Sequence, residues 1–415
     1  MPHPIVFLMF EIMLLLILFY RFLIRFFPGL VALTFSAAVA AQSPALNNSS
    51  DIEAQLNKIL RAIAANRMSE ATKLNDALLQ AYPNFRLAYL IQGDLLRARV
   101  APLRTIGDIP NIPDERVRAL REEALQRLRG YLEKPPSNRV PRYLLQLRTD
   151  QRTAIVVDTK RSRLYVYENT NGQPRFLADF YMTQGKSGSF KLREGDEKTP
   201  IGVYHVTSSI PDSKLDDFYG AGAFPINYPN EWDRLNGRTG SGIWLHGVPS
   251  NTYSRPPKAS NGCVVLSNPD LQKIAQWINP GTTPVVISEE VEWLNLDDWQ
   301  REREQFQSAF DTWRRDWESR DMRRYLGHYA MRFQGDGLNY NQWAERKNAV
   351  NQSKTWIKVG VSNLSMFRYP NKSDEMIVVT FDQDYKSNNL ENKMRKRQFW
   401  IKEQGRWRIL VEEAA

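Results

Sequence analysis

Hydrophobic residues recur at helical spacing in the N-terminal part of the chain, from Asp51 to about Glu133. The stretch IEAQLNKILRAIAANRMSEATKLNDALLQAYPNFRLAYLIQGDLLRAR is rich in alanine and leucine, and its pattern breaks near Asn66 and Pro83. Apolar residues three and four apart fall on one helix face, so we predict a helical region over 50–133. Its segment SEATKLNDALLQAYPN resembles one tetratricopeptide-type helix pair. Because one repeat offers little binding surface, a packing collar for the next domain is favoured over a partner-binding arm.

The periodicity changes after the proline-containing segment EKPPSNRVPR, and we place a linker at 134–150. Short β-rich runs follow, broken by glycine and proline: TAIVVDT, RLYVYEN, FLADFYMTQGK, GVYHVTSSI, SGIWLHGV and TPVVIS. Residues 151–289 are therefore predicted to form a mostly-β domain, a compact sandwich or barrel. One helix is expected at NPDLQKIAQWI, with an Asn or Ser cap and Pro269 in its first turn.

A third pattern begins after EEVEWLNLDDW. Apolar residues at spacings of four, three and four make one stripe on a predicted helix: Phe306, Phe310, Trp313 and Trp317. A second short helix is expected at DMRRYLGHYAMRF, followed by four antiparallel strands at TWIKVGVSNLSMFRY, EMIVVTFDQDYKS, KMRKRQFWIKEQG and RWRILVEE, the last two joined by a Gln-Gly turn. Over 301–415 this order resembles the nuclear transport factor 2-like cone.

These patterns define the expected fold class as multidomain α+β. It comprises a helical N-terminal region, a mostly-β sandwich and a C-terminal α+β cone with a curved antiparallel sheet. The length of 415 residues agrees with several domains, and 42% hydrophobic with 25% charged residues excludes a disordered or fibrous chain. The formal net charge of +10 favours anionic surroundings such as nucleic acid, membrane headgroups or an acidic wall polymer, and does not choose among them.

The first forty residues predict export. Two apolar runs flank Arg21 and Arg25, and the second ends in Ala38-Val39-Ala40 before a polar segment. This is typical of a cleaved signal peptide over 1–41, and a retained membrane anchor is the alternative. The extra run before Arg21 also allows a later translation start, for instance at Met13.

The segment HGVPSNTYSRPPKASNGCVVL contains the only cysteine, Cys263, and one of four histidines, His246. One unpaired thiol in an exported protein cannot form a disulfide within the chain, which marks it as a candidate reactive group. If the segment loops back, His246 takes the thiol proton and the resulting imidazolium keeps Cys263 ionised, while the N–H groups of Gly262 and Cys263 form an anion nest. The alternatives are a buried inert cysteine and a structural histidine.

HG followed by SNGCVVL closely resembles the His…Ser/Thr-x-Gly-Cys signature of the L,D-transpeptidase (YkuD) family. EKTPIGVYHV resembles that family's Thr-Pro-x-Gly-x-Tyr strand, GSGIWLHG its histidine-bearing strand, and NPDLQKIAQWI the helix after its nucleophile. The resemblance covers about 151–288, a third of the chain. Asn261 stands where the family commonly has histidine, and Val265 where arginine or asparagine is usual.

The resemblance implies a β-sandwich with the thiol in a cleft, and peptidoglycan stem peptides as substrates. It assigns Cys263 as the nucleophile and His246 as the base, with the Gly247 carbonyl orienting the imidazole. The remaining site residues are Ser260, Asn261 and Gly262 in the nucleophile loop, Tyr228 as a substrate-lining residue, and Arg255 and Lys258 as contacts for stem carboxylates.

The expected reaction is attack of Cys263 on the third stem residue, release of D-alanine and formation of a thioester. An amine acceptor then gives a 3-3 cross-link, whereas water gives a tripeptide. The alternatives are an L,D-carboxypeptidase, a hydrolase that detaches proteins from the wall, and a non-catalytic scaffold. We expect no cofactor, no metal and no nucleic acid. A periplasmic location is predicted, with membrane contact only through an uncleaved N-terminal segment, and the C-terminal domain is expected to bind a protein or glycan partner.

Overall fold

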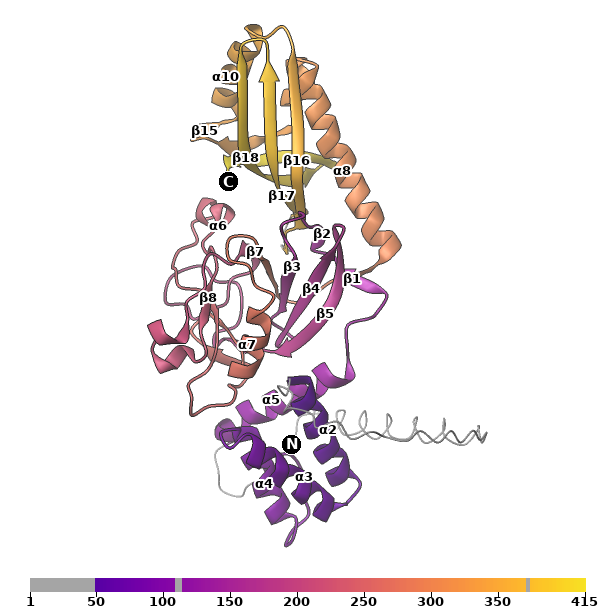
Figure 1. Ribbon diagram of the computed structural model, residues 1–415, viewed down its shortest axis with the longest axis vertical. Coiled ribbons are helices and arrows are strands. Elements are labelled where there is room, and N and C mark those ends of the chain that lie inside the picture. The colour runs from indigo at the N-terminus through magenta and orange to yellow at the C-terminus, as the bar shows by residue number, and fades with distance from the viewer. Residues whose placement is uncertain (1–48, 109–113, 371–373) are drawn as a thin grey trace, which may run out of the picture. The chain divides into compact units, whose positions relative to one another are not determined.

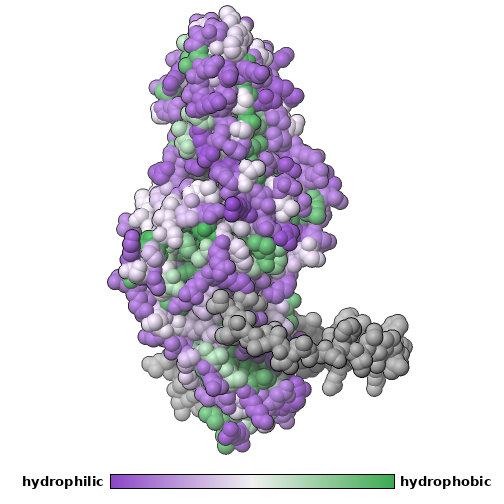
Figure 2. All heavy atoms as spheres, in the orientation of Figure 1, coloured by the Kyte–Doolittle hydropathy of each residue, from purple (hydrophilic) through white to green (hydrophobic). Residues whose placement is uncertain are grey.

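The structure is a computed structural model that describes residues 49–108, 114–370 and 374–415. The predicted signal peptide or anchor at 1–41 lies outside these residues. In the described part, none of the helices combines the length and the apolar character that crossing a membrane requires. The visible face in Figure 2 is mostly hydrophilic over the C-terminal domain, with apolar residues scattered rather than gathered in one patch.

The N-terminal region is helical, as predicted. Its elements are α2 (Ser49–Ala64), α3 (Met68–Ala81), α4 (Arg86–Arg97) and α5 (Asp114–Leu132). The predicted breaks at Asn66 and Pro83 fall in the turns between α2, α3 and α4, and Asn66 has a φ of 58° that ends the first helix. The apolar stripes of all four helices meet in one cluster, which includes Ile59 and Phe85.

A five-stranded sheet forms the first layer of the central domain, with the order β5-β4-β3-β12-β7. Its strands are β3 (Thr153–Asp158), β4 (Arg163–Thr170), β5 (Gln173–Tyr181), β7 (Gly202–His205) and β12 (Pro284–Ser288). β12 pairs in parallel with β3 and antiparallel with β7. Every residue of β3 is buried, because both faces of this sheet are covered.

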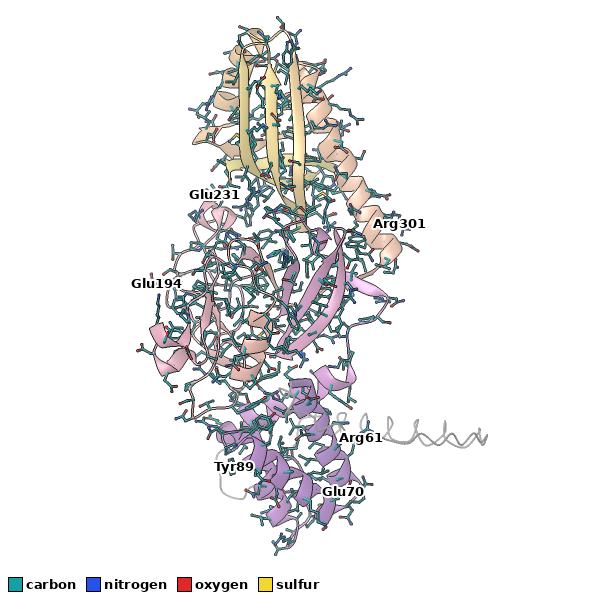
Figure 3. All side chains as sticks on the ribbon, in the orientation of Figure 1. Arg61, Glu70, Tyr89, Glu194, Glu231 and Arg301 are labelled. Carbon is teal, nitrogen blue, oxygen red and sulfur yellow. The ribbon has the colours of Figure 1, made fainter. Side chains whose placement is uncertain are left out.

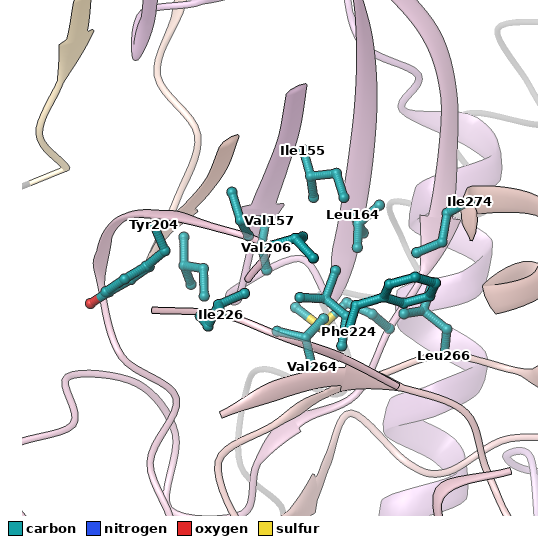
Figure 4. Packing of buried hydrophobic residues seen from close by; sticks show 14 of the residues in the cluster. Ile155, Val157, Leu164, Tyr204, Val206, Phe224, Ile226, Val264, Leu266 and Ile274 are labelled. Atoms are coloured by element: carbon teal, nitrogen blue, oxygen red, sulfur yellow. The ribbon is translucent and has the colours of Figure 1, made fainter. Parts of the chain in front are cut away.

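The second layer is a three-stranded sheet with the order β11-β9-β8. It contains β8 (Ala223–Pro225), β9 (Trp244–His246) and β11 (Val264–Val265), and β10 (Lys258–Ser260) pairs nearby with β6 (Gln184–Gly185). The core lies between the layers, where side chains such as Val157, Phe224 and Val264 converge (Figure 4). The mostly-β sandwich is confirmed.

The central domain holds more helical structure than the sequence predicts. The expected helix is α7 (Asn268–Ala275), whose N-cap Ser267 accepts a hydrogen bond from the backbone of Asp270. A short helix, α6 (Glu231–Leu235), and the 3-10 turns η1 (Asp212–Lys214) and η2 (Asp217–Tyr219) are additional. They lie in glycine-rich and proline-rich sequence that predicts only loops.

The segment expected as a linker at 134–150 contains two strands. β1 (Arg139–Pro141) pairs with β13 (Trp293–Asn295), and β2 (Leu144–Gln146) pairs with β16 of the C-terminal sheet. The prolines of this segment are typical of a linker, but its apolar residues, among them Val140 and Leu145, are buried in the folded protein. The segment is therefore integrated into the fold rather than free.

The C-terminal domain is the predicted cone. Its sheet has the order β15-β14-β19-β18-β17-β16-β2, and α8 runs beside β16 (Figure 1). The elements are α8 (Leu296–Glu318), α9 (Met322–Leu326), β14 (Tyr329–Gly335), β15 (Leu338–Asn339), α10 (Tyr340–Gln352), β16 (Ile357–Arg368), β17 (Met376–Ser387), β18 (Leu390–Glu403) and β19 (Arg406–Ala414). The four predicted strands are present, and Gln404 and Gly405 both have positive φ at the hairpin turn.

The helix expected at 321–333 is wrong in its second half. It ends at Leu326, and β14 begins at Tyr329. Tyr329 and Phe333 are buried on the core side of this strand, so tertiary packing overrides the helical pattern. α10 has no counterpart among the predicted elements.

Candidate active site

Strand alternation places the candidate base and nucleophile on one face of the second sheet. β11 pairs in parallel with β9, with Val264 opposite Leu245 and Val265 opposite His246. Val264 and Leu245 are fully buried and point into the core. Successive strand residues point to opposite faces, so His246 lies on the outer face, and Cys263, two positions before Val265, shares that face.

The nucleophile loop is built around Gly262, which has a φ of 122°. A Cβ there would lie 2.8 Å from the carbonyl oxygen of Lys198, so only glycine fits. The Ser260 hydroxyl donates to the Cys263 carbonyl at 2.7 Å and accepts from the Gly262 N–H at 3.1 Å. Asn261 is exposed at the tip of this loop. Because the Gly262 N–H is already bonded to Ser260, the expected anion nest is not free in the resting loop.

Thr199 also holds this loop, although the sequence did not single it out as a site residue. Its hydroxyl donates to the Gly262 carbonyl at 3.0 Å and accepts from the Gly185 N–H at 2.9 Å. Thr199 is fully buried and belongs to the Thr-Pro motif of EKTPIGVYHV. That motif was the available signal, and its physical role is to fix the turn before the thiol.

His246 is held in one tautomer by the Gly247 carbonyl, which lies 2.7 Å from Nδ1. A carbonyl only accepts, so Nδ1 carries the proton and Nε2 is the free base. The Tyr219 ring packs against the imidazole with centroids 5.1 Å apart, and the Phe218 ring lies 6.0 Å away. His246 is 1% exposed. The structure therefore places Gly247 as its predicted orienting group.

Asn268 positions the backbone around Gly247, and the sequence did not assign it to the site. Its side-chain oxygen accepts from the N–H groups of Ala221 and Val248, both at 3.0 Å, and its amide donates to the Val248 carbonyl at 2.9 Å. A Cβ on Gly247 would collide with that same oxygen. Asn268 therefore ties the start of α7 to the loop that orients the base.

The electrostatics favour a neutral pair at rest. Burial lowers the pKa of His246 to about 4; the hydrogen bond to Gly247 acts in the opposite direction, and the charge of Arg255 adds a smaller lowering. Burial raises the pKa of the Cys263 thiol, although a backbone N–H at Trp244 and the charges of Arg255 and Lys191 act in the opposite direction. The thiol lies 3.4 Å from the Gly242 carbonyl, an acceptor that suits S–H. Both shifts favour the neutral forms over the predicted imidazolium and thiolate pair.

Two cations lower the pKa of the partly exposed thiol. The Arg255 guanidinium lies over the Phe218 ring at 4.6 Å from its centroid, and its charge acts on both Cys263 and His246. Lys191, which the sequence did not single out, is 4% exposed and donates to Asp196 at 2.8 Å. Its loop continues through Glu194, labelled in Figure 3.

The other two predicted substrate contacts lie differently. Lys258 is exposed at the start of β10. Tyr228 is 6% exposed within the core cluster, and its hydroxyl donates to the Thr239 carbonyl at 3.0 Å. Little of Tyr228 is therefore available to touch a substrate.

A cavity of about 330 Å³ lies in the C-terminal cone, away from the residues described above. Lys347 extends over the Trp343 ring at 4.1 Å from its centroid, and the pocket lowers the pKa of its ammonium to about 8, through burial first and the charge of Lys396 second. Trp343 and Gln383 line this cavity, and within the described residues their buried Nε1 and Oε1 atoms have no hydrogen-bond partner. The cavity thus presents an aromatic wall and a cation.

Comparison with known proteins agrees with this arrangement. A model of the L,D-transpeptidase (YkuD) catalytic domain matches residues 152–287, and a model of the Cds6 C-terminal NTF2-like domain matches 305–413. The structure of Bdellovibrio bacteriovorus Bd1075 is similar at 31% identity and a TM-score of 0.59, covering 67% of this chain and 98% of that one. The chain therefore belongs to the L,D-transpeptidase (YkuD) family and carries a C-terminal NTF2-like domain.

Two further proteins are similar to this chain. The helical cell shape determining protein Pgp2 from Campylobacter jejuni is 27% identical with a TM-score of 0.55, and the similarity covers 65% of this chain and 95% of that one. An Escherichia coli (strain K12) protein named "Putative L,D-transpeptidase YafK" is 32% identical over 111 residues, which is 26% of this chain. That match spans 39% of the length of YafK.

Proposed function

We propose that the protein is an exported, cysteine-dependent L,D-transpeptidase that acts on peptidoglycan stem tetrapeptides. The observation that carries the proposal is the pairing of β9 with β11, which places His246 opposite Val265, two residues after the partly exposed Cys263, while the Gly247 carbonyl holds Nδ1 of the imidazole. Membership in the YkuD family supplies the substrate class.

In the first half-reaction, His246 Nε2 accepts the thiol proton as Cys263 Sγ attacks the carbonyl carbon of the third stem residue. The C–N bond to the terminal D-alanine then breaks, and the imidazolium gives its proton to the leaving amine. A thioester remains.

In the second half-reaction, the side-chain amine of another stem attacks the thioester and loses a proton to His246, which returns it to the sulfur. The product is a 3-3 cross-link or another amide. We assign Arg255 to bind a donor carboxylate, since a guanidinium pairs with carboxylates through a fixed pair of N–H groups. Lys258 is the second candidate contact.

The test is to incubate the full chain and its Cys263→Ser variant with disaccharide tetrapeptides and to identify the products by mass. Cross-linked dimers from the parent alone are the expected result. Tripeptide monomers would instead assign an L,D-carboxypeptidase, and release of wall-bound protein from intact sacculi would assign a detaching hydrolase. Absence of both product and thioester would leave a non-catalytic scaffold.

We propose a periplasmic location, supported by the signal-like pattern of 1–41 and by a wall substrate. N-terminal sequencing of the protein recovered from a cell fractionation tests it. A mature end near residue 41 in the periplasmic fraction is expected, whereas an intact N-terminus in the membrane fraction would assign an anchor.

We further propose that the cavity of the cone binds a glycan fragment of the wall. Sugar rings pack on aromatic faces, and the Lys347 ammonium above the Trp343 ring would bind a carboxylate. Isothermal titration with a disaccharide peptide tests this in the Cys263→Ser background. Lys347→Ala should weaken binding at least fivefold, whereas Lys358→Ala, at an exposed position on β16, should not. Equal affinities would refute glycan binding at this cavity.

A further inference from the structure

The loop at 248–257 connects the strand of His246 to the strand that precedes Cys263, and its tip is buried in the N-terminal helical region. Tyr253 belongs to the hydrophobic cluster of α2 to α5. Its ring lies 4.8 Å from that of Tyr82 and 4.9 Å from that of Phe85, measured between centroids. The Tyr253 N–H also donates to the Asn84 carbonyl at 3.2 Å. A catalytic-domain loop is thus anchored in a different domain.

Ser254, the next residue of the loop, is hydrogen-bonded to a buried ion pair on α5. The Ser254 hydroxyl donates to Glu123 Oε1 at 2.6 Å, and Arg127 Nε donates to the same oxygen at 2.9 Å. Glu123 and Arg127 are each 1% exposed. A buried carboxylate with two donors on one oxygen holds a fixed position, so Ser254 is fixed as well.

The backbone of Arg255 is held by the same group of residues. The Arg127 guanidinium lies over the Tyr181 ring at 4.0 Å from its centroid, and the Tyr181 hydroxyl donates to the Arg255 carbonyl at 2.9 Å. Thr183 donates to that carbonyl at the same distance. Ser254 is therefore bonded directly to α5. The carbonyl of Arg255 is linked to α5 through the side chain of Tyr181.

With its backbone fixed, the Arg255 side chain extends over Phe218 toward the reacting groups. Its Nη2 donates to the Phe218 carbonyl at 3.4 Å, and the Phe218 ring faces the imidazole of His246. The charge of Arg255 lowers the pKa of both Cys263 and His246, which agrees with its place over the ring that faces the imidazole.

We infer that the helical region is a clamp, formed by Glu123, Arg127 and the Tyr82–Phe85 turn, that positions Arg255 beside the reacting thiol. Tyr253 and Ser254 are positioning residues in this clamp, and Arg255 is the group that they place. The N-terminal region is therefore part of the active site and more than a packing collar. The inference rests on the proposed function only in treating Cys263 as the nucleophile.

The test measures the pH dependence of Cys263 alkylation by iodoacetamide in the full chain. The reaction reports this thiol alone, because Cys263 is the only cysteine. Tyr253→Ala and Ser254→Ala should each raise the midpoint of the profile, and a rise of one pH unit lowers the alkylation rate at pH 7 about tenfold. Tyr253→Phe keeps the ring and should restore the parent profile. Gln126→Ala is the matched control, since Gln126 lies on α5 and bonds only the Lys160 carbonyl across the interface.

Arg255→Ala should raise the midpoint to the same extent, and its combination with Tyr253→Ala should raise it no further. If circular dichroism shows that Tyr253→Ala does not fold, the alkylation profile of Ser254→Ala tests the inference instead. Folded clamp variants with the parent profile, or effects that add to that of Arg255→Ala, would overturn the inference. Turnover of disaccharide tetrapeptides is measured in parallel: a shifted profile without turnover in the parent supports the clamp and refutes the proposed function.

Discussion

At the scale of single residues, burial decides the chemistry of the site. Sequence reasoning found Cys263 and His246 from their spacing and their neighbours, and it expected an ionised pair. The structure buries the imidazole to 1% exposure, which favours its neutral form, and the Gly247 carbonyl fixes the proton of that form on Nδ1. The spacing of residues along the chain does not show which of them are buried. The sequence therefore predicted which residues form the site, but not their protonation states.

The lowered pKa of His246 predicts a loss of stability in mild acid. Below a pH of about 6.5 the unfolded chain binds a proton at His246, whereas the folded chain does so only near pH 4, so the free energy of unfolding falls as pH drops through this window. The difference corresponds to on the order of 3 kcal/mol. Denaturant unfolding between pH 7 and pH 4.5 should show a smaller fall for His246→Gln than for the parent.

His205 provides the control for this prediction. Its pKa is also lowered to about 4, mainly by burial, and it lies on β7 away from the reacting groups. His205→Gln should reduce the acid-induced loss in the same way while leaving alkylation of Cys263 unchanged. An identical acid-induced loss in the parent and in His246→Gln would contradict the assignment.

At the scale of elements, the nucleophile loop depends on one backbone conformation. Gly262 combines a φ of 122° with a close approach to the Lys198 carbonyl, and Ser260 and Thr199 bond the peptide groups on either side. Any side chain at Gly262 would strain φ and push this backbone apart. The position of Cys263 relative to β9 thus depends on the absence of a Cβ.

Gly262→Ala is therefore expected to cost roughly 1–3 kcal/mol of stability and to lower turnover at least a hundredfold. Thermal melting measures the first effect, and product formation from disaccharide tetrapeptides measures the second. Gly93→Ala is the matched control, because Gly93 lies within α4 with open space around it and should gain about 0.5–1 kcal/mol. Normal turnover in Gly262→Ala would show that the loop tolerates a side chain.

The elements themselves were predicted unevenly, for identifiable reasons. The stripe of Phe306, Phe310, Trp313 and Trp317 and the four C-terminal strands have clear periods, and they were found. The segment 321–333 divides between α9 and β14 because Tyr329 and Phe333 pack into the cone, a tertiary effect. α10 was missed, since among its described side chains only Trp343 is buried and its sequence carries no apolar stripe.

At the scale of the whole molecule, the five-stranded sheet is buried on both faces by two different partners. Ile155 and Val157 of β3 point into the sandwich core, while Ala154 and Val156 join a cluster with residues of the C-terminal sheet such as Phe399. This explains why TAIVVDT is a continuous apolar run rather than an alternating one. The run indicated a buried strand, but its sequence did not predict that the C-terminal domain covers the second face.

The shared cluster predicts that the sandwich and the cone unfold together. Uncovering Val156 and its neighbours would expose apolar surface that neither domain can bury alone, so separate unfolding is disfavoured. In a urea titration, tryptophan fluorescence reports mainly the aromatic core of the cone, and alkylation of Cys263 reports the sandwich. The two probes should give one coincident midpoint.

Substitution at the cluster sharpens the prediction. Phe399 on β18 is 2% exposed and stacks on Trp232 of α6 with centroids 6.4 Å apart, so Phe399→Ala should cost about 3–5 kcal/mol and lower both midpoints together. Met331→Ala, at a side chain that is 73% exposed on β14, should move neither. Two separate transitions in the parent, or a Phe399→Ala variant that shifts the fluorescence midpoint alone, would show that the cone and the sandwich are independent folding units. Joint unfolding would mean that damage to the cone reaches Cys263 through the hydrophobic cluster that the two domains share, without any contact at the site.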